Sequence, residues 1–190
     1  MIVIYRIADI NDAAAIAHLH AESWRNTYRG LMNDSYLDGD IYTERLNYWQ
    51  ARFANPTDNQ FALVAIKDDE LAGFACVYGA FDAEWGSLID NLHVRPDLKG
   101  QGIGKQLIHK AIDWARENYP QIGVYLWVYE ANLPSRGFYE AMGGINKGKE
   151  LHNNEGGKQP YSNIAIHFTI HNAWHKLVCL LHYCAILSLY

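Results

Sequence analysis

Apolar residues recur along this chain with two periods, and each period predicts one kind of element. Short runs rich in β-branched and aromatic residues, bounded by turn residues, are typical of strands. Such runs predict strands at residues 2–7, 61–67, 71–79, 86–94, 121–130 and 161–170. The polar turn "DDE" joins the second and third runs at hairpin spacing, so these two strands are expected to pair.

Apolar positions three and four residues apart predict helices between these strands. Asp9 or Asn11 is expected to cap the first helix, and Pro134 and Gly143 mark the start and the end of the last one. The helical pattern falls within residues 9–28, 42–53, 103–119 and 133–144.

The order of these elements predicts one mixed α/β domain over residues 1–170. Residues 171–190 form an apolar tail to which the sequence assigns no role. The continuous apolar part of this tail is shorter than the roughly 20 residues that a membrane helix needs. A buried or dimer-contacting helix is therefore expected there rather than a membrane anchor, and a homodimer through this tail or through the last strand is an open possibility.

Composition and charge narrow the choice of partner and location. The chain has 190 residues, of which 49% are hydrophobic, enough to bury a full core. A net charge of −5 argues against nucleic-acid binding by neutralisation of phosphates. Three cysteines without metal-ligand spacing favour a reducing compartment and no metal site, and the early charged residues lack the core of a signal peptide. A cytoplasmic protein is expected.

The stretch "RPDLKGQGIGKQL", residues 95–107, has three alternate glycines between a strand end and a helix start. Glycine allows positive φ and close approach of a ligand to the backbone, and free N–H groups at a helix N-terminus bind phosphate. A glycine-rich turn without a ligand is the alternative. The spacing departs from a Walker A loop, because Gln106 follows Lys105, and from a dinucleotide fingerprint, because Lys105 stands at its third glycine.

Two motifs together resemble the GCN5-related N-acetyltransferase (GNAT) family. "LHVRPDLKGQGIGKQL" is similar to its acyl-CoA motif, a strand ending in V-x-P followed by [QR]-x-x-G-x-[GA] at a helix start. Lys99 stands where the family prefers Gln or Arg, which keeps the charge and loses the guanidinium geometry. About thirty residues on, "NLPSRGFYEAMGG" resembles the second motif. The resemblance spans residues 2–170 and implies a mixed, mostly antiparallel sheet of six to seven strands flanked by helices.

This resemblance also implies an activity and a cofactor. The expected enzyme is an N-acetyltransferase that moves an acetyl group from acetyl-CoA to a primary amine of a small molecule, by direct attack in a ternary complex. An amine of a protein or peptide is the alternative acceptor, and a non-catalytic acyl-CoA-binding module is the alternative to an enzyme. The aromatic residues around Trp24 favour a walled pocket and hence a small substrate.

The resemblance implies that the backbone at residues 92–94 holds the pantetheine arm and that the loop at 99–105 holds the pyrophosphate. Asn132 is a plain helix cap by its local pattern, and the resemblance makes it a cofactor contact. The implied cofactor-binding set is Leu92, His93, Val94, Lys99, Gly100, Gln101, Gly102, Ile103, Gly104, Lys105, Asn132 and Tyr139.

Acyl transfer to an amine needs a group that protonates the leaving thiolate and a group that takes the amine proton. Tyr139 matches the motif tyrosine and is the expected acid, although a core aromatic residue would show the same helical spacing. Strand alternation places Asp90 on the same face as Leu92 and Val94. The resemblance implies that this face looks toward the acyl site, which makes Asp90 the candidate base, with a substrate anchor or a plain strand carboxylate as the alternatives. Glu84 is the second candidate base.

The remaining expectations concern His93 and the substrate. Alternation turns the His93 side chain away from the face of Asp90, where a packed imidazole is expected rather than a catalyst. Trp24, Tyr28 and Asp90 are the candidate substrate-binding residues. The resemblance implies that the first two helices and their loop cover the acceptor side, which favours Trp24 and Tyr28, and Asp90 would anchor the substrate from its strand. Trp24 as a plain core residue of the first helix is the alternative.

Overall fold

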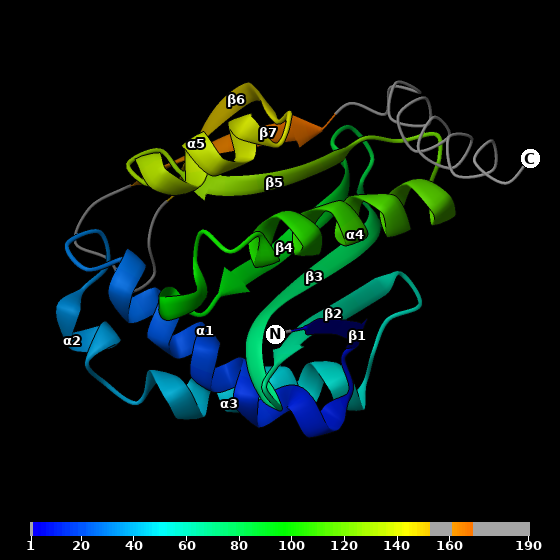
Figure 1. Ribbon diagram of the computed structural model, residues 1–190. Helices are drawn as coiled ribbons and strands as arrows, with labels where there is room; N and C mark the ends of the chain where they lie inside the picture. Colours follow the sequence, from blue (N-terminus) through cyan, green and yellow to red (C-terminus); the bar gives the residue numbers. More distant parts are fainter. Residues whose placement is uncertain (1, 153–160, 169–190) are drawn as a thin grey trace, which may run out of the picture.

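A seven-stranded mixed sheet forms the centre of the molecule in the computed structural model, which describes residues 2–152 and 161–168 (Figure 1). The strand order is β1-β2-β3-β4-β5-β7-β6. The strands are β1 (Val3–Ile7), β2 (Gln60–Lys67), β3 (Glu70–Asp82), β4 (Gly86–Val94), β5 (Val124–Tyr129), β6 (Ile145–His152) and β7 (Tyr161–Phe168). The helices are α1 (Ala13–Thr27), α2 (Asp34–Leu37), α3 (Ile41–Ala54), α4 (Ile103–Asn118) and α5 (Leu133–Ala141), with 3₁₀ turns η1 (Ile10–Asp12) and η2 (Pro96–Leu98).

Every pair of neighbouring strands is antiparallel except β4 and β5. These two are parallel and pair only at Ser87 with Val124 and Leu88 with Tyr125. Beyond Leu88 the two strands diverge, so the middle of the sheet opens toward the C-terminal end of β4. The predicted fold class, a mixed and mostly antiparallel sheet of six to seven strands flanked by helices, is confirmed.

The two faces of the sheet are covered by different helices, as Figure 1 shows. On one face α4 buries Leu107, Ile108 and Ala111 against β2, β3 and β4, as its amphipathic pattern requires. On the other face α1 and α3 pack on β2 and β3, where Trp49 and Phe74 are almost fully buried. In the described part of the chain, no helix has both the length and the apolar character required to cross a membrane.

The hydrophobic pattern located most elements correctly but missed β6. Asp68 and Asp69 form the predicted hairpin turn, both with positive φ, as a tight two-residue turn requires. Asp9 is the predicted cap, since its side chain accepts the Asn11 amide at 2.7 Å. The strand β6 has the polar sequence "INKGKELH" at the edge of the sheet, where one partner strand suffices and no run of apolar residues marks it. The predicted tail, residues 171–190, lies outside the described residues.

A β-bulge in β4 overturns one sequence prediction. Cys76 of β3 pairs with Asn91, and the next residue, Val77, pairs with Ile89, so Asp90 is an extra residue in β4. A bulge shifts the alternation of side chains by one position. Asp90 therefore points toward α3, and the prediction that it shares a face with Leu92 and Val94 is wrong.

Candidate active site

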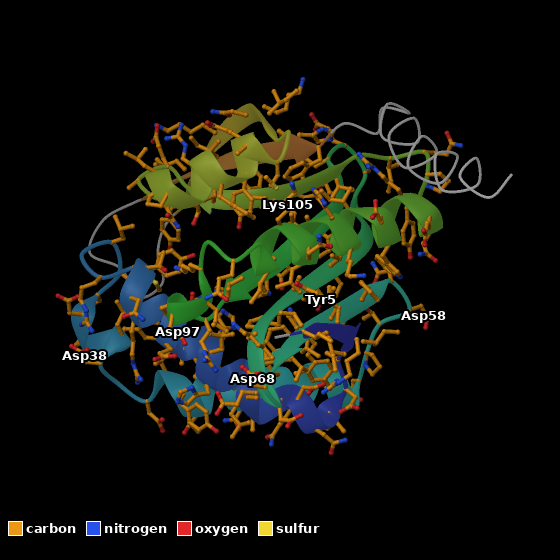
Figure 2. All side chains as sticks on the ribbon, viewed as in Figure 1. Tyr5, Asp38, Asp58, Asp68, Asp97 and Lys105 are labelled. Carbon is orange, nitrogen blue, oxygen red and sulfur yellow. The ribbon has the colours of Figure 1, made fainter. Side chains whose placement is uncertain are left out.

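A cavity of about 450 Å³ lies where β4 and β5 diverge. Its walls come from both faces of the sheet, because the N-terminus of α4 and α5 line one side and α1 lines the other. Figure 2 shows Lys105 on the first turn of α4 and Asp97 in the turn before it. The cavity therefore passes through the opening in the sheet and connects a helix N-terminus to the α1 side. The residues that line it fall within the segments 23–28, 92–94, 98–105, 127–128 and 132–139.

The start of α4 forms a cradle of backbone groups whose chemistry suits an anion. Gly100 and Gly102 have φ of +80° and +83°, and a Cβ atom at either position would meet no atom within 4 Å. The Gln106 amide makes its helical bond to the Gly102 carbonyl at 3.0 Å, so the amides just before it have no acceptor within the helix. These free donors, the helix dipole and the ammonium groups of Lys99 and Lys105 favour a phosphate.

Two members of the predicted loop contribute no side chain to the cavity wall. The Gln101 amide oxygen accepts from Lys67 Nζ at 2.8 Å on the outside of the loop. The side chain of Ile103 is buried in the core under α4.

Gly104 contributes through its small size, because a Cβ there would lie 3.4 Å from Val94 Cγ2 and 3.5 Å from Phe138 Cζ. Its small size lets α4 approach β4 and α5 closely.

Tyr139 of α5 lines the cavity on the side of the cradle. Burial raises the pKa of its phenol, and the nearby Tyr28 raises it further, so the hydroxyl keeps its proton at neutral pH. The Asn132 side chain caps α5 by accepting the Ser135 amide at 3.2 Å, and the same residue lines the cavity. At the other end of α5 a Cβ on Gly144 would lie 2.4 Å from Ile166 Cγ2, so the end of the helix sits directly on β7.

His93 lines the cavity from β4, with its imidazole turned toward α1. Its Nδ1 lies 2.8 Å from Ser23 Oγ, and its ring packs against His20 and Phe74, with centroids 4.8 and 5.1 Å away. Burial lowers the pKa of His93 to about 4, and the charge of Lys99 contributes in the same direction. The imidazole is packed, as expected from the sequence, and its partner Ser23 also lines the cavity.

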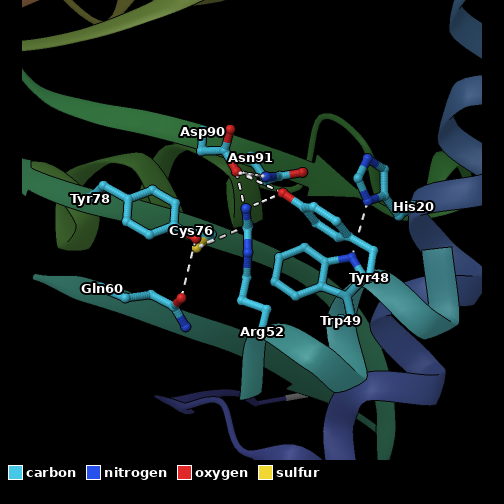
Figure 3. Close-up of polar contacts among 9 residues, drawn as sticks. All are labelled: His20, Tyr48, Trp49, Arg52, Gln60, Cys76, Tyr78, Asp90 and Asn91. Carbon is cyan, nitrogen blue, oxygen red and sulfur yellow. Dashed lines mark hydrogen bonds and ion pairs between the residues drawn. The ribbon is translucent and has the colours of Figure 1, made fainter. Parts of the chain in front are cut away.

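The two candidate carboxylates lie elsewhere. Figure 3 shows Asp90 bound by Arg52 of α3: its Oδ2 accepts from Arg52 Nη1 at 2.8 Å and from Asn91 Nδ2 at 2.5 Å. The Arg52 guanidinium donates to the Tyr48 hydroxyl and stacks on the Tyr48 ring. Glu84 lies on the exposed turn between β3 and β4. Among the described residues that line the cavity, none is Asp or Glu.

The structure separates the two aromatic candidates for substrate binding. Tyr28 lines the cavity, with its ring 4.8 Å from that of Tyr129. Trp24 lies one turn back on α1, packs edge-on against Tyr28 and carries the Arg45 guanidinium over its ring, away from the cavity wall.

Several residues of the wall were missed from the sequence, among them Ser23, Thr27, Trp127 and Phe138. Ser23 and Thr27 are four residues apart, so both lie on the face of α1 that lines the cavity. Helical spacing could have grouped them. Val128 belongs to the core under α4, and its neighbour Trp127 lies on the opposite face of β5. The alternation of side chains along a strand could have predicted this difference. That these faces meet depends on the tertiary structure.

Residues 14–144 match the model of the Acetyltransferase (GNAT) family, and the chain belongs to this family. It is an N-acetyltransferase of a family that uses acetyl-CoA. An uncharacterized N-acetyltransferase of Archaeoglobus fulgidus is 31% identical over 146 residues, which cover 72% of this chain and 89% of the relative.

Two further relatives show the range of likeness. A peptidyl-lysine N-acetyltransferase of Salmonella typhimurium is 37% identical over 81 residues, 42% of this chain and 47% of that protein. The fold matches the crystal structure of PaiA N-acetyltransferase from Thermoplasma acidophilum in complex with coenzyme A, with a TM-score of 0.64 and 20% identity. That match covers 88% of this chain and 98% of the other.

The residues of this chain fit the cofactor of the family. The left-handed glycines leave an open, donor-lined hollow at the start of α4 that a pyrophosphate would fill. Toward β5, the ladder of β4 ends at Leu88, so the backbone groups at residues 92–94 that face the cavity do not pair with β5. An extended amide-bearing arm can bond to those groups as a strand would.

Proposed function

We propose that this enzyme acetylates a primary amine of a small molecule by direct attack on acetyl-CoA within a ternary complex. The observation that carries the proposal is the cavity that joins the α4 cradle to the α1 side through the opening between β4 and β5. A donor entering from the cradle and an amine entering from the α1 side would meet in the middle of the sheet. Holding both reactants in one cavity removes most of the entropic cost of their encounter.

In this proposal acetyl-CoA supplies the thioester carbonyl carbon, and the residues of the chain hold the reactants and move protons. The amides at the start of α4 and the ammonium of Lys105 bind the pyrophosphate. The backbone of residues 92–94 orients the pantetheine arm. Tyr139, whose phenol stays protonated at neutral pH, donates its proton to the departing sulfur.

A small amine is favoured by the walls on the α1 side. Two aromatic residues, Tyr28 and Trp127, line the cavity, and aromatic rings attract cationic amines. The second candidate is a lysine side chain of a protein, which the partial similarity to a peptidyl-lysine N-acetyltransferase supports.

We assign the reaction to the cytoplasm, since an odd set of cysteines without metal-ligand spacing suits a reducing compartment. The homodimer stays a prediction.

The test is release of CoA from acetyl-CoA with a panel of amines: spermidine, L-lysine methyl ester, tryptamine, and a lysine-containing hexapeptide. We expect turnover with at least one of the three small amines and less with the peptide. Preference for the peptide would favour the second candidate. CoA at 100 times its Kd should raise the free energy of unfolding by about 2.7 kcal/mol if it binds at one site, and this appears as a higher melting temperature. That shift without transfer to any amine would indicate a non-catalytic acyl-CoA-binding module.

A further inference from the structure

Five titratable side chains line the described cavity: Tyr28, His93, Lys99, Lys105 and Tyr139. Lysine side chains carry their proton at neutral pH and cannot accept another. Tyrosine hydroxyls are likewise protonated, and burial raises the pKa of Tyr139 further. Among the described residues of this wall, His93 is therefore the only one whose titratable side chain can readily accept a proton at neutral pH.

The position of this imidazole is fixed from behind by a buried row of side chains. Trp49 Nε1 donates to His20 Nδ1 at 3.1 Å, and the His20 ring packs against His93. Phe74 of β3 packs on the His93 ring from the same side. Ser23 Oγ lies 2.8 Å from His93 Nδ1. An imidazole whose Nδ1–H is held by an oxygen keeps its lone pair on Nε2.

We propose that His93 is the catalytic base, and that Ser23 is the positioning residue that holds its Nδ1–H. The proposal rests on the proposed function. The amine nitrogen forms a bond to the acetyl carbon, the carbon–sulfur bond breaks, and His93 Nε2 takes the proton that the nitrogen loses. Tyr139 gives its phenolic proton to the sulfur. Afterwards His93 releases its proton to solvent and Tyr139 recovers one, so the net reaction converts amine and thioester to amide and thiol.

The charges around His93 suit this role. Burial keeps the imidazole neutral before the reaction, since it lowers the pKa to about 4, and Lys99 in the loop before α4 lowers it further. The other side chains in contact are His20 and Ser23 of α1 and Phe74 of β3, of which His20 is also kept neutral by burial. A pyrophosphate beside Lys99 would offset its charge and strengthen the base. Binding of the donor would thus prepare the base for the amine.

Asp90 is the competing base, and its surroundings count against it. Its carboxylate lies on the α3 side of the bulge, bound by Arg52 and Asn91, and it does not line the cavity. The ion pair with Arg52 Nη1 at 2.8 Å holds this carboxylate on the α3 side, away from the reactants that the cavity would hold.

The experiment compares His93→Gln, Ser23→Ala and Asp90→Asn with the wild type, using acetyl-CoA and the best amine of the panel. We expect kcat to fall about 100-fold or more in His93→Gln, as for loss of a general base. In Ser23→Ala it should fall about 10-fold, as for loss of one orienting hydrogen bond. The CoA affinity should stay within about 3-fold, because the cradle is intact. In one further variant, His93→Ala, added imidazole should restore part of the lost rate. The matched control is His18→Gln, an exposed histidine of α1, which should keep the wild-type rate.

A kcat of His93→Gln close to that of the wild type would overturn the proposal, and a 100-fold loss in Asp90→Asn beside it would point to Asp90 as the base. The wild-type protein offers a readout that does not depend on activity. Nitrogen NMR of the histidine rings should show His93 as the neutral Nδ1–H tautomer at pH 7, and CoA should raise its pKa. A neutral Nε2–H tautomer would contradict the assignment. Absence of turnover with every amine in the wild type would instead reject the proposed function.

Discussion

The two ends of the cavity are built in opposite ways. At the end where we propose that CoA binds, the cofactor end, the available groups are main-chain amides from one short loop, Gly100 to Lys105, with two glycines in the left-handed region. At the end where we propose that the amine binds, the acceptor end, the groups come from separate elements, namely Tyr28 of α1, His93 of β4 and Trp127 of β5. A loop that acts through its backbone can be recognised in the sequence by its glycines. A group of side chains from separate elements cannot be recognised in this way, because it forms only when those elements pack together.

The largest expected effect is at the cofactor end. Gly102→Val should weaken CoA binding more than about 100-fold, because the side chain strains a residue at φ +83° and enters the space of the phosphates. Isothermal titration with CoA measures the change. Gly30→Val is the matched control, since Gly30 has φ +81° and an equally open Cβ position away from the cavity. Equal loss of CoA affinity in both variants would mean that backbone strain, and not the cradle, explains the result.

The second effect lies where the two ends meet. Tyr139→Phe should lower kcat about 100-fold while the CoA affinity changes less than about 3-fold, because the ring remains and the proton donor is lost. Steady-state kinetics with the best amine separates the two parameters. Tyr5→Phe, which removes a partly buried phenol outside the cavity, is the control and should leave kcat unchanged. A rate for Tyr139→Phe near that of the wild type would leave Tyr139 as a packing residue.

The same contrast explains how far the sequence predicts this protein. The glycine loop, the amphipathic α4 and the hairpin at Asp68–Asp69 were located because each rests on local rules of backbone and periodicity. Strand β6 escaped because an edge strand needs no apolar run. Asp90 was placed on the wrong face, since one extra residue in β4 reverses the alternation and no local pattern marks it.

The acceptor end shows the same limit. Ser23 and His93 are 70 positions apart, and their contact exists only because α1 packs on β4. The sequence placed His93 away from Leu92 and Val94, which is correct, but treated that side as plain packing. The opening between β4 and β5 brings the His93 side of β4 into the cavity. How far this opening extends depends on where the pairing of β4 with β5 stops, which is at Leu88.

A third prediction concerns the buried histidines behind the acceptor end. Burial holds the pKa of His20 far below its ordinary value and that of His93 at about 4, against about 6.5 in the unfolded chain. The unfolded state therefore binds more protons below pH 6.5, so the free energy of unfolding should fall as the pH drops from 7 toward 5. Melting temperatures across this range should show a weaker dependence in His20→Gln, whose amide can still accept from Trp49. His18→Gln, at an exposed position, should keep the wild-type slope.

The smallest effect is expected for Lys99→Ala, at the border between the two ends. Lys99 is exposed, so solvent and salt screen its ammonium, and the amides of the loop remain to hold the phosphates. The KM for acetyl-CoA should rise about 3-fold, which corresponds to a weak surface charge interaction. The same substitution should raise the pKa of His93, because the ammonium is one cause of its low value. A loss as large as that of Gly102→Val would mean that the lysine side chain, and not the backbone, holds the cofactor.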